Sequence, residues 1–107
     1  MQNDRLPKLL QFLQQSPEDA FLLFAVAKEY EKRGDDTQAE THYQKLLDIH
    51  PDYTGLYYHL GKLHERNGNI SRAIEIYDMG IAACNRVGAA KDRSELNGAR
   101  MNLEIDH

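Results

Sequence analysis

Residues 20–53 read AFLLFAVAKEYEKRGDDTQAETHYQKLLDIHPDY, and residues 54–87 read TGLYYHLGKLHERNGNISRAIEIYDMGIAACNRV. The two stretches are both 34 residues long, and they agree at six positions when they are aligned without a gap. Similar residues fill many of the positions between these identities. A fixed period of this length is typical of proteins built from stacked repeats. The identical pairs are Leu22 and Leu56, Lys28 and Lys62, Glu31 and Glu65, Gly34 and Gly68, Ala39 and Ala73, and Tyr43 and Tyr77.

Each repeated unit is predicted to form two helices joined by a tight turn. In the first unit, Leu23, Val26 and Tyr30 recur at helical spacing. Gly34 follows them, and a glycine can adopt the positive φ with which many helices end. Helical spacing resumes over residues 39–49, and the second unit repeats the same scheme.

Short polar residues mark the expected helix starts, because their side chains can accept hydrogen bonds from the free N–H groups there. Ser16 is the expected cap of the first helix in the first unit, and Asp35 or Asp36 is the expected cap of the second. Asp52 is expected to cap the next helix. Residues 92–95 resemble a capping box and predict one more helix near the end of the chain.

The two ends of the chain differ from the repeated middle. The amphipathic residues 5–15 are predicted to form a helix in the phase of the second helix of a missing preceding unit. Towards the other end, Leu96, Ala99 and Leu103 share one apolar face of a predicted closing helix. The sequence thus predicts one all-α domain over residues 1–107, with a half-repeat helix at 5–15, repeats at 20–53 and 54–87, and a capping helix at 91–105.

These features resemble the tetratricopeptide repeat family, whose pattern has a large apolar residue, Leu-Gly and Tyr on helix A. Its helix B carries Ala, an aromatic residue, Ala-Leu and Pro. The resemblance implies a right-handed α-α superhelix of antiparallel helix pairs. Leu46, His64 and Asn85 depart from the pattern, which prefers a small residue, an aromatic residue and proline there. The matching residues are Leu23, Val26, Ala27, Tyr30, Ala39, Tyr43, Leu47 and Pro51, and then Tyr57, Leu60, Gly61, Ala73, Tyr77, Gly80 and Ile81.

The resemblance also implies a non-catalytic module that binds a protein or peptide on the concave side lined by helices A. An aromatic pair beside a row of positive charge favours an acidic segment, through charge steering and apolar anchoring. The alternative is that the lysine and arginine stems only cover apolar surface, while the rings pack on neighbouring helices. The groove positions of the family fall on Phe21, Phe24, Ala25, Lys28 and Lys32, and on Gly55, Tyr58, His59, Lys62 and Arg66.

The family's carboxylate clamp for chaperone tails matches this chain poorly. The clamp requires Lys and Asn on the first helix A and Asn on the second, where this sequence has Phe24, Lys28 and His59. The sequence also predicts no third helix A to complete such a clamp.

A self-assembling structural protein is the main alternative function. The helix at residues 5–15 has no preceding partner, so Leu6, Leu10 and Leu13 are candidates for an uncovered apolar edge that pairs with another copy. An enzyme is not expected, because the sequence contains no nucleophile elbow or phosphate loop and Cys84 lies in no activating motif.

Composition limits the partners further. The formal charge of −4 argues against nucleic-acid binding, and no apolar run approaches the length of a membrane span. The start of the chain lacks the pattern of a signal peptide, and the lone Cys84 cannot form an internal disulfide, so the cytoplasm is the expected location. His59 and His64 lie five apart rather than the three or four of a helical zinc site, and His42, His50 and His107 add no motif. No metal or other cofactor is expected.

Overall fold

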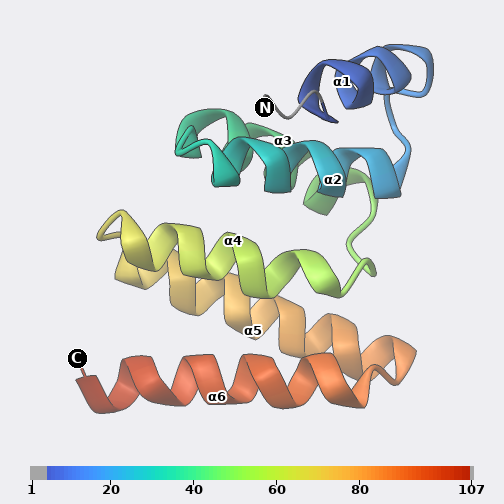
Figure 1. Ribbon diagram of the computed structural model, residues 1–107. Coiled ribbons are helices and arrows are strands. Elements are labelled where there is room, and N and C mark those ends of the chain that lie inside the picture. The colour runs from blue at the N-terminus through green and yellow to red at the C-terminus, as the bar shows by residue number, and fades with distance from the viewer. Residues whose placement is uncertain (1–4, 107) are drawn as a thin grey trace. The chain divides into compact units, whose positions relative to one another are not determined.

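A computed structural model describes residues 5–106, which form six α-helices and no strand (Figure 1). Residues 1–4 and His107 lie outside the described residues. The helices belong to two compact units, of which the first ends at His50 and the second begins at Pro51. The predicted all-α fold is confirmed.

The first unit contains α1 (Arg5–Gln15), α2 (Ala20–Lys32) and α3 (Asp36–Ile49). The helices α2 and α3 form an antiparallel pair, and α1 packs against α2 (Figure 1). The apolar residues that recur at helical spacing are the ones that become buried, so the amphipathic pattern explains the pairing. The buried apolar side chains of this unit are Leu6, Leu13, Leu23, Ala25, Val26, Ala27, Ala39, Tyr43, Leu46 and Leu47.

The second unit contains α4 (Gly55–Arg66), α5 (Ile70–Val87) and α6 (Ala90–Asp106). The helix α5 runs antiparallel to both α4 and α6, so α4 and α6 run in the same direction (Figure 1). The helix α6 packs against α5 and also reaches α4. The buried apolar side chains are Leu56, Tyr57, Leu60, Leu63, Ala73, Ile76, Tyr77, Ala83, Cys84, Leu96, Ala99 and Leu103.

Glycines close the turn inside each helix pair, as the sequence predicts. Gly34 has a φ of 79° and follows α2, while Gly68 has a φ of 82° and follows α4. A side chain at either position would strain the backbone, because L-residues rarely adopt positive φ. The repeated glycine therefore sets the length of helix A in both units.

The capping residue of α2 differs from the prediction. Asp19 is the N-cap, and its carboxylate accepts a hydrogen bond from the backbone N–H of Leu22 at 2.9 Å. Ser16 lies too early, because the chain first makes a turn in which the N–H of Asp19 donates to the carbonyl of Ser16. For α3, the cap is Asp35, whose carboxylate accepts from the backbone N–H of Gln38 at 3.1 Å.

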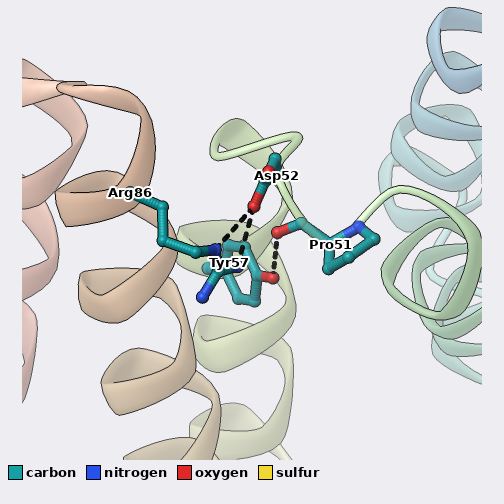
Figure 2. Close-up of polar contacts among 4 residues, drawn as sticks. All are labelled: Pro51, Asp52, Tyr57 and Arg86. Atoms are coloured by element: carbon teal, nitrogen blue, oxygen red, sulfur yellow. Dashed lines mark hydrogen bonds and ion pairs between the residues drawn. The ribbon is translucent and has the colours of Figure 1, made fainter.

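Asp52 does not cap α4, contrary to expectation. Its carboxylate accepts hydrogen bonds from Nη2 and Nε of Arg86, at 2.7 and 3.0 Å (Figure 2). The hydroxyl of Tyr57 donates to the carbonyl of Pro51 in the same region. Both contacts hold the segment before α4 within the second unit. The Asp52 carboxylate therefore pairs with α5 and does not cap the start of α4.

Asp92 does not open a capping box either. The helix α6 begins at Ala90, which places Asp92 inside its first turn. The hydroxyl of Thr54, the residue before α4, donates to the Asp92 carboxylate at 2.6 Å. This hydrogen bond holds the start of α6 beside the start of α4.

Gly80 lies where α5 makes its closest approach to α4 and α6. A Cβ atom at this position would lie 2.6 Å from Cβ of Tyr57 and 2.8 Å from Cδ1 of Leu96. Carbon atoms that are not bonded normally stay about 3.5–4.0 Å apart. The close approach therefore depends on the missing side chain of Gly80. Ala39 and Ala73, which occupy the alanine position of the repeat pattern, are fully buried.

Replacing Gly80 with alanine should destabilise the protein, because the nearest atom is a Cβ that cannot swing away. We expect Gly80→Ala to lower the free energy of unfolding by about 1–3 kcal/mol, as overpacked cores do. The matched control is Gly98→Ala in α6, where an added Cβ meets nothing within 4 Å. That variant should gain about 0.5–1 kcal/mol from helix propensity. Urea denaturation measures both, and equal stability of the two variants would contradict the close approach at Gly80.

Candidate functional site

An aromatic ring and a lysine recur as a pair on helix A of each unit. The ammonium nitrogen of Lys28 lies 5.8 Å from the ring centroid of Phe24, and that of Lys62 lies 5.6 Å from the ring centroid of Tyr58. Residues four apart on a helix are neighbours on its surface, so the spacing itself produces the pair. These distances fall within the range of cation–π attraction. The two pairs occupy equivalent positions and carry the chemistry expected for the groove.

In the first unit, the structure divides the predicted groove residues into two kinds. The side chain of Phe21 is 65% exposed, whereas Phe24 is half-buried with its ring centroid 6.2 Å from that of Tyr43. Lys32 lies 3.6 Å from the carboxylate of Glu29, whose side chain is only 6% exposed. Phe24 therefore has a packing role as well as a surface, and Lys32 is engaged by an acid of its own helix.

In the second unit, Tyr58 and Lys62 line a hollow of about 350 Å³ between α4 and α6. We call this hollow the α4–α6 groove. Its walls combine an aromatic ring, one charge of each sign, and hydroxyl and amide groups that can bond to a peptide backbone. Tyr58 and Lys62 come from α4, and the lining residues from α6 are Ser94, Glu95, Gly98, Ala99 and Asn102.

The other predicted groove residues of the second unit lie outside the α4–α6 groove lining. The ring of His59 stands edge-on to that of Tyr58, with 5.9 Å between the centroids. Arg66 is exposed in the last turn of α4. Of the five residues predicted for this unit, the structure brings Tyr58 and Lys62 together in the groove, and Gly55, His59 and Arg66 are not among its lining residues.

The alignment of the two repeats at a fixed period predicts no third helix A, so it does not identify the α6 wall of the groove. The buried apolar residues of α6 are Leu96, Ala99 and Leu103. Leu96 and Ala99 lie three residues apart, as the buried Tyr57 and Leu60 do in α4. The offset from Tyr57 to Leu96 is 39 residues rather than 34. The helix α5 has 18 residues where α3 has 14, so the chain turns back about one helical turn later.

The α6 wall could have been found by searching for the apolar pattern of helix A at offsets other than 34 residues. At the offset of 39 residues, Ser94 corresponds to Gly55 and Gly98 corresponds to His59, and both of those were predicted groove positions. The helix α6 therefore stands beside α4 as a third helix A stands beside the second.

A hydrogen-bonded network connects the groove to the core of the second unit. The hydroxyl of Tyr77 donates to the carboxylate of Glu65, and that carboxylate lies 3.7 Å from the ammonium nitrogen of Lys62. In the first unit, the hydroxyl of Tyr43 donates to Glu31 at 2.6 Å. Burial raises the pKa of Tyr77 well above its ordinary value, and the hydrogen bond to Glu65 raises it further.

The predicted apolar edge on α1 is largely used within the first unit. Leu6 and Leu13 are buried, and Leu10 is half-buried. Phe12 is the large exposed apolar side chain of this helix, at 56%. An open hollow of about 580 Å³ lies along α1, and its lining residues are Pro7, Leu10, Gln11, Leu13 and Gln14.

Other kinds of site find little support in the described part of the chain. Over residues 5–106, no three His, Cys, Asp or Glu side chains gather closely enough to hold a metal ion. Burial raises the pKa of the Cys84 thiol, which disfavours the reactive thiolate. None of the helices between Arg5 and Asp106 is long and apolar enough to cross a membrane.

Comparison with known proteins agrees with the repeat pattern. The sequence profile described as TPR repeat matches residues 27–68. The crystal structure of a tetratricopeptide repeat domain protein from Salinibacter ruber is similar to this chain, with 40% identity and a TM-score of 0.78, and the match covers 81% of this chain and 97% of that one. The solution structure of a protein from Bordetella parapertussis has 25% identity and a TM-score of 0.83, covering 99% and 91% of the two chains. Among curated proteins, none matches significantly.

The network around Tyr77 predicts that stability falls in alkali. The folded protein holds the phenol neutral beyond the pH of about 10 at which an unfolded chain loses that proton. Below that pH both states keep the proton; above it only the unfolded chain loses it, so the free energy of unfolding decreases as pH rises. We expect a smaller decrease between pH 8 and pH 11 for Tyr77→Phe than for the wild type.

Urea denaturation at both pH values measures this difference. The variant should be the less stable protein at pH 8, because it lacks the hydrogen bond to Glu65. Burial also raises the pKa of Tyr57. Tyr57 is present in both proteins, so its contribution to the pH dependence of stability is common to them. Identical pH dependence in the two proteins would show that Tyr77 is not the group that loses its proton on unfolding.

Proposed function

The chain belongs to the tetratricopeptide repeat family, and we propose that it is a non-catalytic module that binds a partner protein through the helix A faces of its two units. Members of this family are in general protein-interaction scaffolds rather than enzymes. Repeat proteins of this kind offer extended surfaces rather than enclosed pockets. An extended peptide segment of the partner fits such a surface.

The observation that carries this proposal is the α4–α6 groove. The ring of Tyr58 offers a flat apolar surface, and Lys62 stands over it with an ammonium group. Aromatic side chains dominate the binding energy of many interfaces, and charges guide the approach of the partner. The side chains of Ser94 and Asn102 can form hydrogen bonds with the backbone of an extended peptide.

The first unit supports the same function with its own aromatic and lysine pair. Lys28 and Phe24 repeat the arrangement of Lys62 and Tyr58 at equivalent positions of helix A. The exposed ring of Phe21 adds apolar surface near the start of α2. We infer that either unit can offer one aromatic anchor and one lysine to a partner segment that brings at least one acidic group.

Self-association through α1 is the alternative function. The exposed ring of Phe12 and the half-buried Leu10 favour it. The burial of Leu6 and Leu13 leaves a smaller apolar edge than the sequence predicts. We therefore propose helices A rather than α1 as the partner site. We also propose that the partner is met in the cytoplasm, because the lone Cys84 suits a reducing compartment.

Filling the groove should abolish binding without unfolding the protein. Gly98 lines the groove and has open space beside it, so Gly98→Tyr places a ring in the hollow. Asn97→Tyr is the matched control, because Asn97 is exposed on the same helix and is not among the lining residues. The probe is a nine-residue peptide selected on the wild type from a randomised display library. We expect Gly98→Tyr to lose at least about tenfold in affinity by fluorescence anisotropy, as truncated or blocked anchors do.

In that experiment, Asn97→Tyr should bind as the wild type does. Equal affinity of all three proteins would place the peptide site away from the groove. Circular dichroism melting of each variant checks that the fold is retained.

Charge and apolar contact should respond differently to salt. Lys62→Glu should weaken binding of the same peptide, and this loss should shrink as salt rises and screens exposed charges. Tyr58→Ala should weaken binding by lost apolar contact, and its effect should change little with salt. Titrations at about 50 mM and 500 mM salt, for which the Debye length falls several-fold, separate the two. A salt-independent effect of Lys62→Glu would show that Lys62 does not steer the partner.

A further inference from the structure

The charges that face the α4–α6 groove are not those of a purely basic site. Lys62 lines it from α4, and Glu95 lines it from α6. These two are the charged residues of the lining, one of each sign. A partner segment that is uniformly acidic would meet one favourable charge and one unfavourable charge in the same hollow.

The arginines of α6 do not add to the positive charge of the groove. Arg93 donates to the side-chain oxygen of Asn85 at 2.9 Å, and Arg100 donates to the carboxylate of Asp78 at 2.7 Å. Asn85 and Asp78 both belong to α5, so these two arginines are directed away from the hollow between α4 and α6. They hold α6 on α5 instead.

Lys62 is itself partly balanced by an acid of its own helix. Its ammonium nitrogen lies 3.7 Å from the carboxylate of Glu65, which also accepts the hydroxyl of Tyr77. The lining thus contains the ammonium group of Lys62 and the carboxylate of Glu95, and the carboxylate of Glu65 lies beside Lys62. One acidic side chain of a partner segment can pair with Lys62, and a second has no other positive charge of the lining to pair with. A basic side chain of the segment can pair with Glu95.

The order of these charges along the groove follows from the start of the two helices. The hydrogen bond from Thr54 to Asp92 sets α4 and α6 level at their starts, and the helices run in the same direction. Glu95 lies three residues after Asp92, whereas Lys62 lies eight residues after Thr54. At 1.5 Å per residue the difference is roughly 7 Å along the groove. An extended peptide spans that distance with about two residues.

We propose that the α4–α6 groove selects a partner segment in which a basic and an acidic side chain lie about two residues apart, rather than a uniformly acidic segment. This inference rests on the proposed function of the groove. The acidic side chain pairs with Lys62, the basic side chain pairs with Glu95, and the segment lies over the ring of Tyr58. Exposed ion pairs contribute little each, so the selection is several-fold and depends on salt.

The test is a selection from the randomised nine-residue display library on the full-length protein. The library is first depleted on Gly98→Tyr, so that only peptides that need the open groove remain. We expect the enriched peptides to carry Lys or Arg within about three positions of Asp or Glu. Enrichment of acidic residues alone would overturn the inference while leaving the proposed function intact. If depletion leaves no peptide that binds the wild type, the groove is not a peptide site and the proposed function fails with it.

A charge exchange on one enriched peptide sharpens the result. Glu95→Lys should weaken binding of that peptide by about two- to fivefold, in the range of exposed ion pairs. Glu95→Gln should weaken it less, because it removes the attraction without adding repulsion. The double variant Lys62→Glu with Glu95→Lys should prefer the peptide whose basic and acidic residues are exchanged. No change of preference in the double variant would overturn the pairing. Glu95 is exposed and Lys62 is half-buried, so melting by circular dichroism of each variant checks that the fold is retained.

Discussion

The hydrogen bond between a helix B tyrosine and a helix A glutamate is the contact on which each unit depends. Tyr43 and Tyr77 are fully buried, and each donates its hydroxyl to the glutamate twelve residues earlier. A buried phenol needs such a partner, because an unsatisfied hydroxyl is costly in the core. The bond therefore fixes how deeply helix B lies against helix A. In the second unit the ring also requires Gly61, where a Cβ would come within 2.2 Å of Cε1 of Tyr77.

The period of the sequence predicts most of this arrangement, because each helix pair buries the same face and has a glycine at the same turn between its two helices. The N-caps could not be predicted as well, since Asp52 and Asp92 are drawn to Arg86 and Thr54 by contacts between helices. The sequence also predicts Tyr58 and Lys62 as groove residues. The fixed period of 34 residues does not predict Glu95, because a longer α5 shifts the offset of the last helix.

The two units differ at a buried position of helix A, and this difference affects the candidate site. Glu29 in the first unit corresponds to Leu63 in the second, and both side chains are buried. A buried carboxylate must be paired to be tolerated. Arg5 of α1 lies 3.4 Å from it and Lys32 lies 3.6 Å from it. The half-repeat helix thus supplies a charge to the first unit as well as the apolar contacts of its leucines.

Ion pairs within the protein change the electrostatics of the helix A face in each unit. The sequence predicts a row of positive charge, but Lys32 is held by Glu29 and Lys62 is shared with Glu65. Charges that already have partners in the protein attract a ligand less strongly, because the new contact replaces an old one. The rings of Phe24 and Tyr58 make no such exchange when a partner covers them. Binding energy at these helices should therefore come mainly from the aromatic anchors, and the charges should decide which segments are accepted.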